Sequence, residues 1–278
     1  MIAIVPSRAT VFAAAALLAA STCGARADDV SPWVSEQYSA VRLLAGSRSG
    51  AVLLGGIAFQ LQPGWKTYWR TPGDSGVPPR FDFSKSENVE SVTILWPAPQ
   101  AFPDGAGGTS LGYKGQVVLP LRIVTKHADK PVTLRATVDY AVCDKLCIPV
   151  QATPELSFAS VASTQDGALA SALDSVPVPA NVGDANPVAI RDVARKGDKD
   201  VEVDVVAPPK AKISLFVEGP TPEWALPVPK EIKGAPPGMR RFSFALDGLP
   251  PGAQASGAAL KFTLVGPERA YEINTTLE

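Results

Sequence analysis

Apolar and polar residues alternate with a period of two along several short segments of the chain. In residues 132–140 the apolar side chains occupy every second position, and polar side chains lie between them. Residues 117–123 and 201–205 follow the same pattern, which continues in 242–244 and 262–264. Successive side chains of a β-strand point to opposite faces, so this alternation is typical of half-buried strands. The pattern therefore predicts an all-β protein.

Helical periodicity is scarce, and the best candidate for a helix runs from Gln165 to Asp174. It falls within residues 161–186, which are rich in Ala, Ser, Asp, Asn and Pro and show no strand alternation. Such a segment between two strand-rich blocks is typical of a linker. We therefore expect two antiparallel β-sandwich domains, residues 28–160 and 187–278, joined by this linker. The 27 prolines and 23 glycines fit the frequent turns of such a fold.

The first 27 residues have the pattern of a secretory signal peptide. Arg8 supplies a positive charge, residues 11–20 form a short apolar run, and residues 25–27 read Ala-Arg-Ala, a cleavage pattern. We expect the exported chain to begin near Asp28, so that Cys23 is lost with the signal. Export places the remaining cysteines where disulfides persist.

The charge composition argues against nucleic acid and anionic lipid as main partners. The 26 basic and 27 acidic residues are well mixed, and the net charge is −1. A surface that binds phosphates needs a basic patch, and no long run of one sign appears. The chain also has no Gly-rich phosphate loop, so we expect no nucleic-acid partner and no cofactor.

Cys143 and Cys147 are the two cysteines that remain after the signal, and three residues separate them. A fully extended chain would place them about 13 Å apart, whereas a disulfide needs Cα atoms roughly 4.4–6.8 Å apart. Residues 144–146 must therefore bend for a disulfide to form, and a three-residue hairpin loop would do so. Pro149 cannot donate to a central ladder, which favours an edge for the following strand. We expect the pair at an exposed end of a sheet.

The residues alone leave three roles open for this pair. A structural disulfide that closes so small a ring would contribute only about 2 kcal/mol, against roughly 4–5 kcal/mol for a long loop. Reversible thiol–disulfide exchange is the second role. Two thiolates could also hold a soft Cu(I) ion. A zinc site is disfavoured, because two cysteines and His127, which sits in a predicted solvated turn, cannot fill a tetrahedral shell.

Four segments together resemble a known family. Residues 63–76, 96–99 (Trp-Pro-Ala-Pro), 112–115 (Gly-Tyr-Lys-Gly) and 140–149, which hold both cysteines, are similar to the N-terminal periplasmic domain of DsbD-type thiol:disulfide interchange proteins. The likeness is greatest to the ScsB-like branch. It covers the first expected domain, and the second weakly resembles the additional β domain of that branch. The resemblance implies an immunoglobulin-like fold for the sandwich domains.

The resemblance also implies a function for the cysteines. Cys143 and Cys147 match the redox-active pair of that family, with Cys147 as the expected nucleophile and Cys143 as its resolving partner. The implied role is that of a periplasmic thiol:disulfide oxidoreductase. It would take electrons from a membrane-embedded thiol reductase and pass them to oxidised periplasmic thioredoxin-like proteins. A non-catalytic binding or assembly module with a structural disulfide is the alternative.

Two features of the sequence depart from this family. Its members shield the cysteines with a cap loop that bears an aromatic residue, whereas residues 102–111 are Gly-rich, which leaves Phe102 or Tyr113 as possible substitutes. The membrane domain and the thioredoxin-like domain of the family do not follow in this sequence. We expect the aromatic residues of the first matching segment to lie mostly in the core, and a partner-docking surface is the alternative: Trp65, Tyr68 and Trp69.

Overall fold

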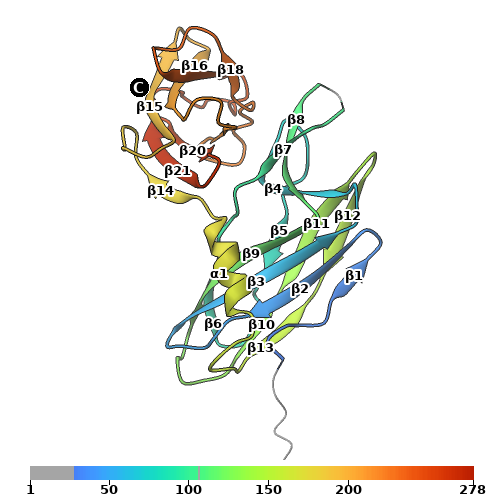
Figure 1. Cartoon of the computed structure of the whole chain (residues 1–278). Helices are drawn as coiled ribbons and strands as arrows, with labels where there is room; N and C mark the ends of the chain where they lie inside the picture. Colours follow the sequence, from blue (N-terminus) through green and yellow to red (C-terminus); the bar gives the residue numbers. More distant parts are fainter. Residues whose placement is uncertain (1–27, 106) are drawn as a thin grey trace, which may run out of the picture.

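The computed structural model describes residues 28–105 and 107–278 (Figure 1). The strands fall into two groups: an N-terminal unit with β1 to β13 and a C-terminal unit with β14 to β21. The short helix α1 lies between the two units in the sequence. The predicted signal peptide, residues 1–27, lies outside the described residues. Within the described part of the chain, no helix has the length and apolar character needed to cross a membrane.

Two sheets form the body of the N-terminal unit, with strand orders β1-β2-β3-β9-β6 and β12-β11-β4-β8-β7. Strand β5 also pairs with β11, and β10 pairs with β13. All of these pairs are antiparallel. The strands are β1 Val34–Glu36, β2 Ser39–Ala45, β3 Val52–Leu61, β4 Lys66–Gly73, β5 Arg80–Asp82, β6 Val89–Ile94, β7 Gln100–Pro103, β8 Thr109–Lys114, β9 Gln116–Thr125, β10 Val132–Arg135, β11 Thr137–Cys143, β12 Cys147–Ala152 and β13 Glu155–Phe158.

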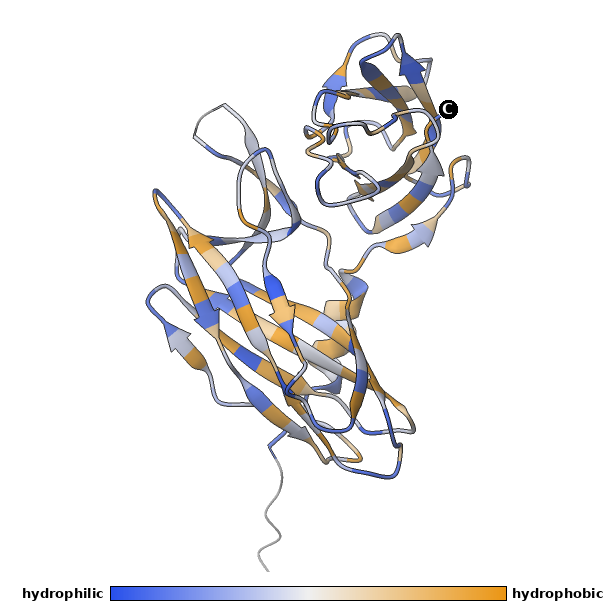
Figure 2. Cartoon of the chain, turned by 180° about the vertical axis from the view of Figure 1, so that it is seen from behind, coloured by the Kyte–Doolittle hydropathy of each residue, from blue (hydrophilic) through white to orange (hydrophobic). Residues whose placement is uncertain are grey.

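Side chains from both sheets meet in one hydrophobic cluster. Ile57 and Leu119 enter it from the first sheet, and Trp69 and Val138 enter it from the second. Burying each such side chain contributes about 1.5–3 kcal/mol, so the two apolar faces hold the sheets together as a β-sandwich. Figure 2 shows the alternation of apolar and polar residues along these strands. The predicted immunoglobulin-like β-sandwich is therefore confirmed.

The C-terminal unit repeats this architecture with smaller sheets. Their strand orders are β14-β21-β20-β17 and β15-β16-β19-β18. A second core cluster lies between them, and Val201, Val203 and Val205 point into it from β16, as the period-two pattern predicts. All pairs are antiparallel except β14 with β21, which is parallel. The strands are β14 Val178–Ala180, β15 Ala189–Lys196, β16 Asp200–Val206, β17 Ser214–Glu218, β18 Lys230–Ile232, β19 Met239–Ala245, β20 Ala259–Val265 and β21 Ala270–Thr276.

The segment expected to be a linker contains ordered elements that join both units. Helix α1, Asp166–Asp174, lies where the helix is predicted, and Leu169 on it is fully buried beside Leu44 and Ala58 of the N-terminal unit. Glycines make room for Leu169: a Cβ atom at Gly56 would lie 2.8 Å from one of its methyl carbons. Further along, β14 adds a strand to the C-terminal unit. Tertiary contacts therefore order this polar segment.

Truncating Leu169 tests the attachment of α1 to the sandwich. We expect Leu169→Ala to lower the free energy of unfolding by about 2–5 kcal/mol, because the cavity cannot be refilled by the flanking glycines. Guanidinium unfolding measures the change. Leu173→Ala, a truncation at a half-buried position of the same helix, is the matched control and should cost less than half as much. Equal losses for the two variants would contradict the packing of Leu169.

Candidate functional site

The cysteines close a tight hairpin at the end of one sheet. Strands β11 and β12 are antiparallel neighbours whose register pairs Cys143 with Cys147, and the two sulfurs form a disulfide with an S–S distance of 2.13 Å. Residues 144–146 form the loop, in which the backbone N–H of Asp144 donates to the carbonyl of Leu146 at 3.2 Å. Strand β12, which contains Pro149, lies at one end of the strand order. The predicted hairpin and edge strand are both confirmed.

The two cysteines differ sharply in exposure. Cys147 is exposed, whereas Cys143 is only 1 % exposed. Cys143 lies on the face of β11 shared with Asp139 and Ala141, and this face turns away from the sandwich core. Tyr68 covers it there, so that Tyr68, Ala141 and Cys143 form a small buried cluster of their own. An incoming sulfur can therefore reach Cys147 much more easily than Cys143.

The Tyr68 hydroxyl contacts both sulfurs. It donates to Cys143 Sγ at 2.9 Å and lies 3.2 Å from Cys147 Sγ. Since disulfide sulfurs carry no hydrogen, Tyr68 is the donor to both. Burial raises the pKa of Tyr68, and the negative charge of Asp104 raises it further, so the hydroxyl keeps its proton at neutral pH. The backbone of Gly76 packs on the ring, because a Cβ atom there would lie 2.4 Å from a ring carbon.

Strand pairing places Tyr68 at the sulfurs. Strand β4 meets β11 where Lys66 lies opposite Cys143, and the Thr67 hydroxyl donates to the buried carbonyl of Ala141 at 2.9 Å. Lys66 and Tyr68, two residues apart, therefore share the face of β4 that adjoins the disulfide. Sequence reasoning assigned Tyr68 to the core and missed this contact. The period of two separates Tyr68 from Trp69, but only the pairing of β4 with β11 reveals what Tyr68 touches.

Lys66 lies beside the disulfide, and Lys114 lies opposite Lys66 on the neighbouring strand β8. Lys66 Nζ donates to Ser110 Oγ at 2.8 Å, and Lys114 Nζ lies 4.6 Å from the centroid of the Phe102 ring. Burial lowers the pKa of Lys66, and the charge of Lys114 lowers it further, while two nearby carboxylates oppose this change. A positive charge near a cysteine favours its thiolate form. Lys66 is thus a second neighbour of the pair that the sequence did not predict.

Neither Tyr113 nor Phe102, the two possible substitutes for the aromatic residue of the cap loop, has a recorded contact with a cysteine in the described structure. Tyr113 is buried, and its hydroxyl donates to the carbonyl of Pro97 at 2.8 Å. Phe102 is half-buried, and both Lys66 and Lys114 lie over its ring. The aromatic ring that shields Cys143 is that of Tyr68, which comes from β4 rather than from residues 102–111.

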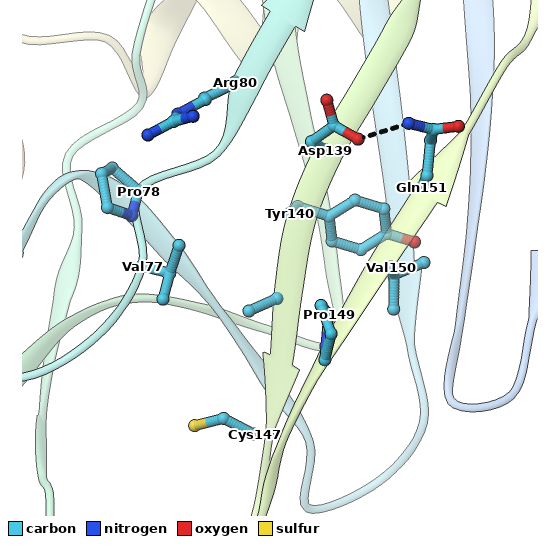
Figure 3. A pocket seen from close by; sticks show the side chains of 10 residues that line it. Val77, Pro78, Arg80, Asp139, Tyr140, Cys147, Pro149, Val150 and Gln151 are labelled. Carbon is cyan, nitrogen blue, oxygen red and sulfur yellow. Dashed lines mark hydrogen bonds between the residues drawn. The ribbon is translucent and has the colours of Figure 1, made fainter.

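An apolar pocket of about 580 Å³ opens beside Cys147 (Figure 3). Val77 and Pro78 form one wall, and Ala141 and Pro149 contribute to the hairpin side. Asp139 lies at the polar end, where it accepts a hydrogen bond from Gln151 at 2.7 Å. The exposed cysteine thus sits at the edge of a hollow that can receive apolar side chains of another molecule.

Among the described residues, no group of three or more His, Cys, Asp or Glu side chains is arranged to hold a metal ion. The backbone N–H of His127, in the turn between β9 and β10, donates to Asn88 Oδ1 at 2.9 Å, and the side chain is exposed. The copper hypothesis therefore rests on the two sulfurs alone.

Comparison with known proteins gives a family match and, among the solved structures, a match over most of the chain. Residues 38–158 match the family model of the N-terminal region of the thiol:disulfide interchange protein DsbD. The crystal structure of the N-terminal periplasmic domain of ScsB from Proteus mirabilis has a TM-score of 0.72 and 22 % identity, over 90 % of this chain and 98 % of that chain.

Other comparisons add little. A conserved domain protein from Bacillus anthracis has a TM-score of only 0.29 and 8 % identity, over 86 % of this chain and 78 % of that chain. No curated protein sequence matches. The matched residues 38–158 contain every strand of the first sandwich except β1, together with the disulfide hairpin and Tyr68. Over residues 38–158, the chain therefore contains a DsbD-type N-terminal domain.

Proposed function

We propose that this protein is a periplasmic thiol–disulfide exchange protein. It would take electrons from a membrane-embedded thiol reductase and pass them to oxidised periplasmic thioredoxin-like proteins. The observation that carries the proposal is the asymmetry of the disulfide: Cys147 is exposed, and Cys143 is buried against a hydrogen-bond donor. The protein would have two domains, residues 28–160 and 187–278, and the redox site would lie in the first.

The difference in exposure supports different roles for the two cysteines, with Cys147 as the nucleophile and Cys143 as the resolving cysteine. In the reduced protein the Cys147 thiolate attacks a sulfur of the partner's disulfide, and that bond breaks to release one partner thiolate. Cys143 then loses its proton and attacks Cys147 Sγ, which breaks the mixed disulfide and releases the second partner thiolate. Two electrons pass to the partner, and the Cys143–Cys147 bond forms again. Attack by a donor thiolate on Cys147 reverses these steps.

Tyr68 supports the step in which Cys143 leaves. When a donor attacks Cys147, the electron pair of the broken bond stays on Cys143 Sγ, which becomes a thiolate in a buried place. Burial of a charge without a partner is costly. The hydroxyl of Tyr68, 2.9 Å away, already points at this sulfur and would stabilise the negative charge as it forms.

The reduction potential separates exchange from a structural role. Cys143 and Cys147 already lie opposite each other in a paired hairpin, so their disulfide adds little constraint to the fold. We expect a potential above about −300 mV, because structural disulfides lie below that value. Equilibration with dithiothreitol buffers, followed by alkylation of free thiols, measures it. A potential below this limit would favour the binding module with a structural disulfide.

Single-cysteine variants test which sulfur is attacked. We expect Cys143→Ala to form a mixed disulfide with an oxidised thioredoxin-like protein through the exposed Cys147. The matched control, Cys147→Ala, keeps only the buried Cys143, and we expect it to react with Ellman's reagent at least about tenfold more slowly because opening must precede attack. Mass spectrometry follows the reaction of both variants with the same reagent. Equal rates for the two variants would contradict the proposed roles.

Removing the Tyr68 hydroxyl tests the stabilisation of the leaving sulfur. Tyr68→Phe should slow reduction of the disulfide by dithiothreitol roughly ten- to hundredfold, since a hydrogen bond to a charged group contributes about 1.5–3 kcal/mol. Stopped-flow kinetics under excess reductant gives the rate. Tyr113→Phe removes another buried hydroxyl, whose acceptor is the Pro97 carbonyl, and should leave the rate unchanged. A Tyr68→Phe rate within twofold of the unmodified protein would refute this role.

A further inference from the structure

Four consecutive residues of β4 connect the disulfide to the C-terminal unit. Tyr68 touches both sulfurs. The next residue, Trp69, is fully buried, and its ring centroid lies 6.2 Å from that of Phe216 on β17. Arg70 and Thr71 both bond to Glu218, at the end of the same strand β17. The C-terminal unit therefore holds the part of β4 that directly follows the redox contact.

The ionic contact between the units is extensive. The Arg70 guanidinium donates to both carboxylate oxygens of Glu218, at 2.7 to 3.2 Å, and to Glu272 Oε2 at 2.7 Å. Only 21 % of the Arg70 side chain and 15 % of the Glu218 side chain are exposed. Burial acts to lower the pKa of Arg70, but the hydrogen bonds and charges of Glu218 and Glu272 outweigh it and raise the pKa. These hydrogen bonds to two carboxylates fix the position of the Arg70 guanidinium.

The apolar contact is equally specific. Leu215 and Val217 of β17 point into the core of their own unit. Phe216, between them, points the other way and belongs to the hydrophobic cluster of the N-terminal unit, where it is 1 % exposed. Strand β17 is thus buried on both faces, as strands between two packed layers are. The two units share a core at this point.

Within the sheet, this part of β4 has few constraints of its own. Strand β4 pairs with β8 at Tyr68–Gly112 and next at Gly73–Ser110, with a register shift between them. Residues 69–72 therefore face only Leu111 and form a bulge. A bulge leaves residues outside the regular ladder and re-aims their side chains. The burial of Trp69 in the first core and the contacts of Arg70 and Thr71 with the C-terminal unit therefore both contribute to its conformation.

We propose that the C-terminal unit is a positioning element of the redox site: through Glu218, Glu272 and Phe216 it holds the β4 bulge so that the Tyr68 hydroxyl lies at Cys143 and Cys147. Glu218 is the positioning residue whose removal shows this. The inference rests on the proposed thiol–disulfide exchange. It gives the second sandwich a function in the reaction of the first, although none of its residues contacts a sulfur in the described structure.

A double-mutant cycle in the full chain tests the proposal. The variants are Glu218→Ala, Tyr68→Phe and the two combined, and the measurement is the rate of disulfide reduction by dithiothreitol across a range of pH. We expect Glu218→Ala to slow reduction about fivefold to tenfold when Tyr68 is present, the size of one weakened hydrogen bond to a charged group. In the Tyr68→Phe background the same change should have less than a twofold effect.

A matched variant separates positioning from general loss of stability. Asp204 forms a comparable pair with Arg241, at 2.7 Å, inside the C-terminal unit, and Glu202 forms an ion pair with the same arginine. Asp204→Ala should lower the unfolding midpoint and leave the reduction rate unchanged. If Glu218→Ala does not fold, Glu218→Gln, which removes the charge and keeps the shape, replaces it in the cycle.

The outcomes distinguish this inference from the function on which it rests. If the unmodified protein is reduced and traps a partner, but Glu218→Ala is unaffected or acts equally in both Tyr68 backgrounds, the positioning role is overturned and exchange stands. An equal slowing by Asp204→Ala also overturns it. If dithiothreitol fails to reduce the unmodified protein, the exchange function itself is refuted, before any variant is compared.

Discussion

The pairing of β4 with β11 is the contact on which the proposed exchange site depends. It places Lys66 opposite Cys143, buries the hydrogen bond from Thr67 to the Ala141 carbonyl, and so brings Tyr68 over both sulfurs. Without this neighbour, the outer face of β11 would expose Cys143 to solvent. The two cysteines would then be similar in exposure, and the difference on which their proposed roles rest would be lost.

The same strand also explains how two sandwiches act as one structure. Over a few residues β4 supplies a sulfur contact, a core tryptophan and a half-buried arginine, because successive side chains of a strand point in opposite directions. One face serves the disulfide, and the other enters the core. Where the ladder with β8 is interrupted, the C-terminal unit takes over the support. The boundary between the units is thus built from well-packed side chains rather than from a flexible joint.

Much of this arrangement could be predicted from the sequence, and the part that could not has a clear physical reason. The hairpin at Cys143 and Cys147, the edge position of the strand with Pro149, and the short helix follow from local spacing and composition. The contact of Tyr68 with Cys143 joins residues 75 positions apart. Likewise, the pair of Arg70 and Glu218 spans 148 positions. No local pattern records such pairings, because they depend on which strands become neighbours.

Helix α1 likewise has a position that the sequence predicts and a tertiary contact that it does not. Its position was predictable from a run of Ala and Leu, yet its attachment was not, because the groove for Leu169 is made by Gly46 and Gly56, far upstream. A glycine in a strand interior ordinarily weakens the strand. Here the missing side chains create the space that binds the segment between the two sandwiches.

A hairpin at the edge of a sheet carries a risk, because an exposed edge strand can pair with strands of other chains and so promote aggregation. Pro149 lies within β12, two residues after Cys147. A proline has no backbone N–H, so it offers no hydrogen-bond donor to an approaching chain. Cys147 therefore stays accessible to the side chains of another protein, whereas continuous edge-to-edge pairing with further copies of the chain is interrupted at Pro149.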